Sequence, residues 1–255
     1  MLSYSDNGKG NALVFLHGYC ESMAVWNAFD AQLSQTNRVI CIDLPGYGKS
    51  KPIPHLSMES MADAVFEAIN HLEIKHFVVI GHSMGGYVAL ALAEKHPKSI
   101  MGLCLFHSTA YPDSEEKQAQ RNKTIKYLNE NGVEAFIRPF VPPLFHSPNR
   151  ERCKASIQKL IDIGLSTPLN VISESAAAMR DRPDRTHVLS ESKFPVLFIV
   201  GKNDGAVKPE DSMAQSLLPS KSYVQILGET GHQGLFERES ETIKMLEAFE
   251  HICFN

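Results

Sequence analysis

Residues 76–95, H-F-V-V-I-G-H-S-M-G-G-Y-V-A-L-A-L-A-E-K, carry the strongest indication of architecture in the chain. The apolar run at 76–81 predicts a buried strand, and residues 84–95 predict a helix. Between them, G-H-S-M-G matches the pattern G-x-S-x-G, in which a sharp turn from strand to helix exposes the serine to a base. The two outer glycines have no Cβ atom to crowd this turn. The pattern therefore predicts Ser83 as a nucleophile.

The same alternation of short apolar runs and helical patterns continues on both sides of this turn. Further strands are predicted at 12–16, 38–42, 100–106, 195–200 and 223–227, and further helices at 22–34, 57–71 and 236–252. In the last helix we expect an inner stripe of Ile243, Leu246, Phe249 and Ile252. Strands that are apolar on both faces and alternate with helices indicate an α/β fold, with a mostly parallel central sheet flanked by helices.

The alternation stops between the strands at 100–106 and 195–200. This part of the chain is more polar and has no strand pattern, and its helical stretches, at 114–130, 132–138, 149–163 and 168–180, are separated by proline-containing turns. We therefore expect an α/β core made of residues 1–110 and 193–255, with residues 111–192 inserted as a helical cap.

Two backbone N–H groups are candidates for stabilising an oxyanion. Acyl transfer needs such a pair, aimed at the oxygen that becomes negative. Met84 follows the predicted nucleophile, and Tyr19 follows His17-Gly18 at the end of the first apolar strand. We predict that Tyr19 and Met84 donate these N–H groups, whereas the His17 side chain is expected only to hydrogen-bond to the backbone.

A base and an acid follow the last two predicted strands. His232 lies in the glycine-rich loop G-E-T-G-H-Q-G, and Asp204 lies in G-K-N-D, just after the strand at 195–200. An aspartate there orients the histidine and stabilises its protonated form. We predict His232 as general base and Asp204 as its orienting acid, with Asp211 and Asp113 as the alternative acids.

Taken together, these motifs resemble the α/β-hydrolase superfamily, and most of all its small cofactor-free esterases, perhydrolases and C–C hydrolases. The matching motifs are His17-Gly18, D-L-P-G-Y-G-K-S at 43–50, G-H-S-M-G-G at 81–86, G-K-N-D at 201–204 and Gly231-His232. The resemblance implies the α/β-hydrolase fold, with the insertion as a cap that roofs the active site. Only about ten residues precede the first core strand, so the family's leading hairpin is expected to be reduced to a single strand or less.

The composition limits the compartment and the partners. The chain has 255 residues, of which 43% are hydrophobic and 21% charged, and its net charge is −4 with histidine counted neutral. This weak charge and the lack of a long basic run argue against nucleic-acid binding. No apolar run reaches roughly 18 residues, so no membrane span is expected. Five cysteines, an odd number without a C-x-x-C pair, and a start without a signal-peptide pattern predict a cytoplasmic protein.

Several other patterns are interpreted as structural. G-Y-G-K-S at 46–50 is not a phosphate loop, because Asp43 stands where that motif needs a glycine. No zinc site is expected, because the chain's histidines, His82, His107 and His146 among them, lack a metal-binding spacing. For most of the bulky side chains of the insertion we expect helix packing, with pocket lining as the alternative: Tyr127, Phe136, Phe140, Phe145 and Met179.

The sequence thus predicts a serine hydrolase that needs neither a cofactor nor a metal. Its expected substrate is a small to medium uncharged carboxylic ester or thioester, cleaved through an acyl-enzyme on Ser83. The same residues would serve a C–C bond, lactone, amide or peracid hydrolase, and a hydrolase-derived ligand receptor with incidental turnover is the non-enzymatic alternative. Apart from a small molecule, no partner is predicted; the oligomeric state is left open, with a homodimer as one option.

Overall fold

The apolar runs of the sequence form one sheet in the computed structural model, which describes residues 1–255. Its strands are β1 (Tyr4–Gly8), β2 (Ala12–Leu16), β3 (Arg38–Ile42), β4 (Phe77–His82), β5 (Ile100–Phe106), β6 (Val196–Gly201) and β7 (Ser222–Leu227). Their order across the sheet is β1-β3-β2-β4-β5-β6-β7. All neighbouring strands run parallel except β1, which is antiparallel to β3. The predicted fold class is confirmed.

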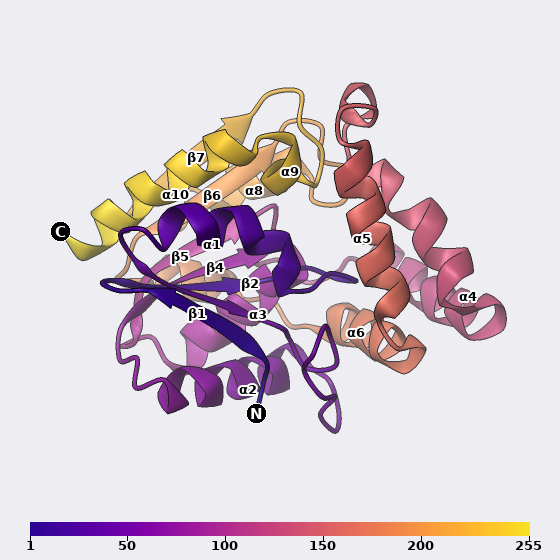
Figure 1. The fold of residues 1–255 in the computed structure, drawn as a ribbon, viewed down its shortest axis with the longest axis horizontal. Coiled ribbons are helices and arrows are strands. Elements are labelled where there is room, and N and C mark those ends of the chain that lie inside the picture. Colours follow the sequence, from indigo (N-terminus) through magenta and orange to yellow (C-terminus); the bar gives the residue numbers. More distant parts are fainter.

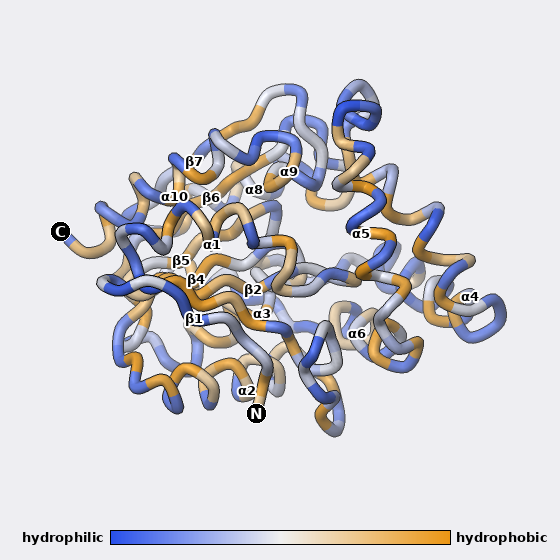
Figure 2. The backbone as a smooth tube through the Cα atoms, in the orientation of Figure 1, coloured by the Kyte–Doolittle hydropathy of each residue, from blue (hydrophilic) through white to orange (hydrophobic).

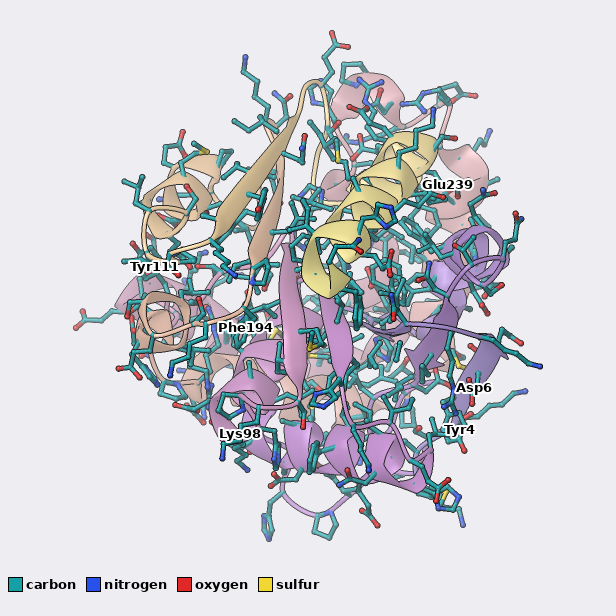
Figure 3. All side chains as sticks on the ribbon, turned by 90° about the vertical axis from the view of Figure 1, so that its left-hand side faces the viewer. Tyr4, Asp6, Lys98, Tyr111, Phe194 and Glu239 are labelled. Carbon is teal, nitrogen blue, oxygen red and sulfur yellow. The ribbon has the colours of Figure 1, made fainter.

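One edge of the sheet is formed by β1, a single strand in place of the family's leading hairpin, as expected from the sequence. β1 is a single strand, and its residue Tyr4 lies opposite Ile42 of β3. Asp6 forms an ion pair of 2.7 Å with Arg38 of β3, and Figure 3 labels Tyr4 and Asp6 on this strand. Charged side chains on an edge strand discourage pairing with another chain.

Helices cover both faces of the sheet (Figure 1). The core helices are α1 (Asn27–Leu33), α2 (Met58–His71), α3 (Met84–Lys95), α8 (Pro209–Gln215), α9 (Gly234–Glu237) and α10 (Glu239–Phe254). α1 packs against α10, and α2 packs against α3. Ser57 caps α2, because its side chain accepts a hydrogen bond from the N–H of Ser60 at 3.1 Å.

Two predicted details of these helices differ from the structure. The first helix begins as a 3₁₀ turn, η1 (Met23–Trp26), before α1. In α10, Ile252 is 39% exposed and does not face the core, and Cys253 is buried in its place. Residues four apart share a helix face, so the stripe that contains Phe249 continues at Cys253.

The segment between β5 and β6 is helical, as predicted. Its helices are α4 (Glu115–Phe140), α5 (Lys154–Ser166), α6 (Leu169–Asp181) and α7 (Thr186–Ser190). α4 packs against α5 and α6, whereas α7 contacts α3 of the core. α4 bends at Gly132, whose φ of 82° and ψ of 174° are not helical, close to the predicted break between residues 130 and 132.

The insertion and the sheet share one apolar core. A single cluster of buried hydrophobic residues contains side chains of all strands except β1 and also Leu128, Ile137, Val171 and Ile172 of α4 and α6. In Figure 2 the central strands β2 and β4 are mostly orange, whereas the tube of α4 and α5 alternates between blue and orange. None of the helices combines the length and the apolar character needed to cross a bilayer.

Candidate active site

Ser83 occupies a strained turn between β4 and α3. Its φ of 51° and ψ of −116° lie in a region that costs a residue other than glycine about 1–3 kcal/mol. The turn is held by the surrounding backbone, since the N–H of Ser83 donates to the carbonyl of Phe106 at 2.9 Å. A Cβ atom on Gly81 would lie 2.4 Å from the carbonyl oxygen of Gly85, and one on Gly85 would lie 2.4 Å from that of Leu16. Glycine is therefore required at both positions, as expected from the sequence.

The structure brings together the three residues predicted as a triad. Nε2 of His232 lies 2.9 Å from Oγ of Ser83, and Nδ1 of His232 lies 2.8 Å from Oδ2 of Asp204. Because a carboxylate can only accept, Nδ1 carries the proton and Nε2 is free to accept one from the serine. The alternative acids lie elsewhere: Asp211 is in α8, and Asp113 forms ion pairs with two arginines of the insertion.

Asp204 is a buried carboxylate whose two oxygen atoms both have partners. Oδ1 accepts the N–H groups of Ala206 and Val207 at 2.8 and 3.0 Å, and Oδ2 faces two imidazoles. Burial would raise the pKa of Asp204, but the electrostatic attraction of His232 and the hydrogen bonds from both imidazoles outweigh it and hold the pKa well below its usual range. Asp204 is therefore ionised and fixed in one orientation.

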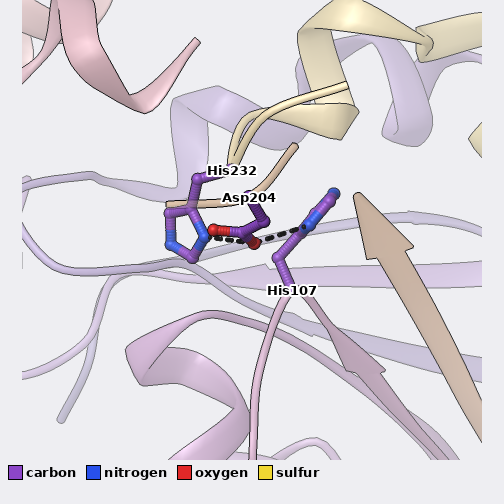
Figure 4. Close-up of side chains that lie close together, drawn as sticks. All are labelled: His107, Asp204 and His232. Atoms are coloured by element: carbon purple, nitrogen blue, oxygen red, sulfur yellow. Dashed lines mark hydrogen bonds and ion pairs between the residues drawn. The ribbon is translucent and has the colours of Figure 1, made fainter. Parts of the chain in front are cut away.

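The second imidazole on Asp204 belongs to His107, at the end of β5. Its Nδ1 lies 3.1 Å from Oδ2 of Asp204, so the carboxylate lies between His107 and His232 (Figure 4). Burial lowers the pKa of His107 to about 4, and its Nε2 has no partner. Nδ1 faces both this carboxylate and the N–H of Gly201, which lies 3.2 Å away. A neutral imidazole with its proton on Nδ1 satisfies the charged carboxylate and leaves Nε2 as a bare nitrogen, which costs less than an unpaired N–H; the N–H of Gly201 then cannot donate to Nδ1. The spacing of His107 in the sequence indicates only that it is not a zinc ligand, and this contact with Asp204 was not predicted.

The same cluster is where a metal ion would have to bind. His107, Asp204 and His232 each offer one ligand atom, and these atoms lie within 4.8 Å of one another. Both Nδ1 atoms already point at the carboxylate, and the remaining nitrogen of His232 faces Ser83. A cation would have to displace these hydrogen bonds, so the arrangement fits a hydrogen-bonded triad with an additional histidine.

Of the two predicted oxyanion donors, Tyr19 lines the same cavity as Ser83, and Met84 directly follows the serine in the chain. Tyr19 follows β2, and Met84 is the first residue of α3. The N–H groups of these two residues make none of the hydrogen bonds of the loops and helix ends. His17 behaves as expected: Nδ1 lies 2.9 Å from the carbonyl of Gly18, and Nε2 accepts the N–H of Leu44 at 3.0 Å.

A buried ion pair supports both loops and was not recognised in the sequence. Nδ1 of His82 lies 3.0 Å from Glu21, and Nε2 of His82 lies 3.0 Å from the carbonyl oxygen of His232. Both partners are acceptors, so His82 is doubly protonated. Burial opposes both charges, but their mutual attraction raises the pKa of His82 and lowers the pKa of Glu21 to about 2. Glu21 also accepts the N–H of Gly18 at 2.7 Å, so the pair ties the loop of Tyr19 to the loop of His232.

A cavity of about 300 Å³ lies above Ser83 and His232. Three of the five bulky side chains singled out in the insertion, Phe136, Phe140 and Met179, line it. The expectation that most of the five only pack helices together is therefore wrong. Phe136 and Phe140 follow the bend in α4, and Met179 lies in α6. Phe145 is buried and Tyr127 is 44% exposed, and neither lines the cavity.

Comparison with known proteins agrees with this geometry. The sequence model of the alpha/beta hydrolase fold family matches residues 11–151. A malate-bound thermophilic esterase from Thermogutta terrifontis superposes with a TM-score of 0.95 and 29% sequence identity, covering 100% of this chain and 94% of that one.

Two curated relatives show similar sequence identity over most of the chain. A 2-hydroxy-6-oxononadienedioate/2-hydroxy-6-oxononatrienedioate hydrolase from Burkholderia vietnamiensis is 26% identical, over 96% of this chain and 89% of its own length. The dihydrolipoyllysine-residue acetyltransferase component of an acetoin cleaving system from Pseudomonas putida is also 26% identical, over 94% of this chain. The chain spans 63% of the length of that second relative.

Proposed function

Since the chain belongs to the α/β-hydrolase fold family, we propose that it is a serine hydrolase that cleaves a small to medium carboxylic ester or thioester. The observation that supports this most strongly is the continuous hydrogen-bonded path from Ser83 through His232 to Asp204, at 2.9 and 2.8 Å. A base at this distance is what a serine hydroxyl needs to become a nucleophile.

In the first half-reaction, Oγ of Ser83 attacks the carbonyl carbon while Nε2 of His232 takes the hydroxyl proton. The carbonyl oxygen becomes negative and is stabilised by the N–H groups of Tyr19 and Met84. The tetrahedral intermediate then collapses and its C–O or C–S bond breaks. The leaving alcohol or thiol takes the proton from His232, and the acyl group remains on Ser83.

In the second half-reaction, His232 removes a proton from water, which attacks the acyl carbon. Collapse of this intermediate breaks the bond to Ser83, returns the proton to its oxygen and releases the carboxylic acid. Asp204 holds the imidazole in the required tautomer and stabilises it when it is protonated. In this proposal Glu21, His82 and His107 are positioning residues, because they act through the base, the acid and the loop of Tyr19.

The insertion has a separate role in this proposal. Residues 1–110 and 193–255 form the catalytic core, and residues 111–192 form a cap whose side chains line the cavity beside Ser83. The five cysteines are all buried and unpaired, which supports the cytoplasmic location expected from the sequence.

A second candidate is the cleavage of a C–C bond, lactone, amide or peracid by the same residues. The similarity to a dienedioate hydrolase supports this second candidate. The same triad can attack any of these acyl carbons. A ligand receptor with incidental turnover is disfavoured by the complete hydrogen-bonded path.

Replacement of Ser83 tests the proposal. The wild-type protein is expected to react with a fluorophosphonate probe and to hydrolyse p-nitrophenyl acetate, whereas Ser83→Ala should not be labelled and should lose about 10⁴-fold or more in kcat. Ser166→Ala, which removes an exposed hydroxyl of α5, is the matched control. Absence of labelling in the wild type would support the receptor, and unchanged hydrolysis by Ser83→Ala would refute the nucleophile.

A further inference from the structure

The cavity above Ser83 has an apolar side and a cationic side. Phe136 and Phe140, from the second half of α4, lie on the apolar side, with their rings stacked 4.9 Å apart. The first half of α4 contributes Lys117, Gln120, Arg121 and Thr124 to the lining. These four positions recur at the three- and four-residue spacing of one helix face, so one polar stripe faces the cavity.

Lys117 is not neutralised by the protein. Its Nζ donates to the carbonyl of Ala206 at 3.3 Å, and no carboxylate lies within ion-pair distance of it. An ammonium has three donors, so two of them are available to a ligand.

Arg121 is held in place but only partly used. Its Nε donates to Oδ2 of Asp113 at 3.1 Å, and Asp113 also forms an ion pair of 2.7 Å with Arg182. The side chain of Asp113 is 1% exposed, so this anchor is buried. The two Nη groups of Arg121 have no hydrogen-bond partner in the protein. Two guanidinium groups share one carboxylate, which leaves one positive charge without a partner.

The one acidic residue in the cavity lining does not neutralise these cations. Glu21 is already paired with His82, accepts the N–H of Gly18, and accepts the side-chain amide of Gln233 at 2.9 Å. The cavity therefore carries a net positive charge on the side formed by Lys117 and Arg121.

We propose that the substrate of Ser83 carries a free carboxylate, which Lys117 and Arg121 bind while its apolar part lies against Phe136 and Phe140. A guanidinium fork and a neighbouring ammonium suit a carboxylate, which accepts hydrogen bonds through both oxygen atoms. This inference rests on the proposed function, and it replaces the uncharged substrate expected from the sequence, because the sequence could not show which face of α4 meets the nucleophile.

The test compares pairs of similar esters with and without this charge. Mono-p-nitrophenyl glutarate and p-nitrophenyl valerate have acyl chains of equal length, with and without a terminal carboxylate. 4-Carboxyphenyl acetate and 4-methylphenyl acetate form the corresponding pair for the leaving group. The pair whose charged-to-neutral ratio falls in Arg121→Gln identifies the side of the scissile bond on which the carboxylate lies.

We expect the wild type to prefer the charged member of one pair in kcat/KM. Arg121→Gln should lower that charged-to-neutral ratio by about 10- to 100-fold, the usual range for a hydrogen bond to a charged group. Lys117→Gln should lower it in the same direction, and both effects should weaken as salt rises. Lys123→Gln, an exposed lysine of the same helix that does not line the cavity, is the control and should leave the ratio unchanged.

Binding of glutarate separates this inference from the proposed function. Glutarate should raise the thermal midpoint of Ser83→Ala, and adding Arg121→Gln or Lys117→Gln should abolish the rise. If the esters are cleaved but the ratio is close to one in both pairs, or is unchanged in both variants, the carboxylate site is refuted and the hydrolase stands. If no ester is cleaved but glutarate binds through these two side chains, the hydrolase is refuted and the carboxylate site stands.

Discussion

The catalytic groups on the core and the polar stripe of the insertion differ in how completely their charges are paired. On the core, Asp204 and Glu21 are buried, and all their carboxylate oxygen atoms have partners within the protein. On the insertion, Lys117 and Arg121 keep donors without partners. A fully paired group has a fixed orientation before substrate arrives, whereas an unpaired one gains its partner only from a ligand. The core is therefore suited to the reaction, and the insertion to the choice of substrate.

The largest effect should come from the core. Asp204→Asn should lower kcat by about 10⁴-fold, because an amide can stabilise the wrong tautomer of His232. The KM for p-nitrophenyl valerate should change little, since the cavity lining is intact. The measurement is steady-state kinetics, with far-UV circular dichroism to verify folding. Asp211→Asn is the matched control and should retain kcat. An equal loss in both variants would contradict the assignment of Asp204.

The next largest effect is a loss of about 3 kcal/mol in the free energy of unfolding as the pH falls. The pKa of His107 is about 4 in the folded protein and 6.5 without its surroundings. Between these values the unfolded chain binds a proton that the folded chain does not, so the free energy of unfolding falls as the pH drops from about 6.5 to 4. Glu21, with a pKa lowered from 4.5 to about 2, contributes stability above pH 4.5 that is lost as the pH falls toward 2.

Urea unfolding of His107→Asn at pH 7, 5.5 and 4 isolates the first of these contributions. The variant keeps a donor for Asp204 but has no group that titrates in this range. Its stability should therefore fall less than that of the wild type between pH 7 and pH 4. Parallel curves for the two proteins would show that the buried imidazole is not the cause.

The smallest effect should come from the apolar side of the insertion. Phe140→Ala should lower kcat/KM for p-nitrophenyl valerate by about 3- to 10-fold relative to the acetate, because a few apolar contacts with the longer acyl chain are lost. Tyr127→Ala removes an exposed aromatic ring from the same helix and serves as the control. A fall in kcat for the acetate itself would mean that Phe140 also positions the catalytic groups, which would contradict a role limited to substrate choice.

The sequence predicted the core better than the insertion, for physical reasons. Ser83, Asp204 and His232 follow apolar strands, and the carboxyl ends of parallel strands meet at one edge of a sheet, so local patterns were enough to bring them together. His107 also follows an apolar strand, at 100–106, but it belongs to no catalytic motif. The roles of Glu21 and His107 depend on partners 61 and 97 residues away in the chain, which local patterns do not reveal. Which side of α4 lines the cavity depends on how the helices pack, and periodicity alone does not determine that packing. The positions of Lys117, Arg121 and the phenylalanines of α4 were therefore not predicted.

The bend at Gly132 has a consequence for how the protein can diversify. Almost only glycine adopts its backbone conformation. A Cβ atom there would meet nothing within 4 Å, so the requirement for glycine comes from the dihedral angles and not from crowding. The bend joins a charged segment to an aromatic segment of α4. Because one residue corresponds to about 100° of helix rotation, adding or removing a residue at this joint would change which side chains of the aromatic segment face the cavity, while the sheet below kept its shape. Relatives could acquire new preferences by altering one hinge.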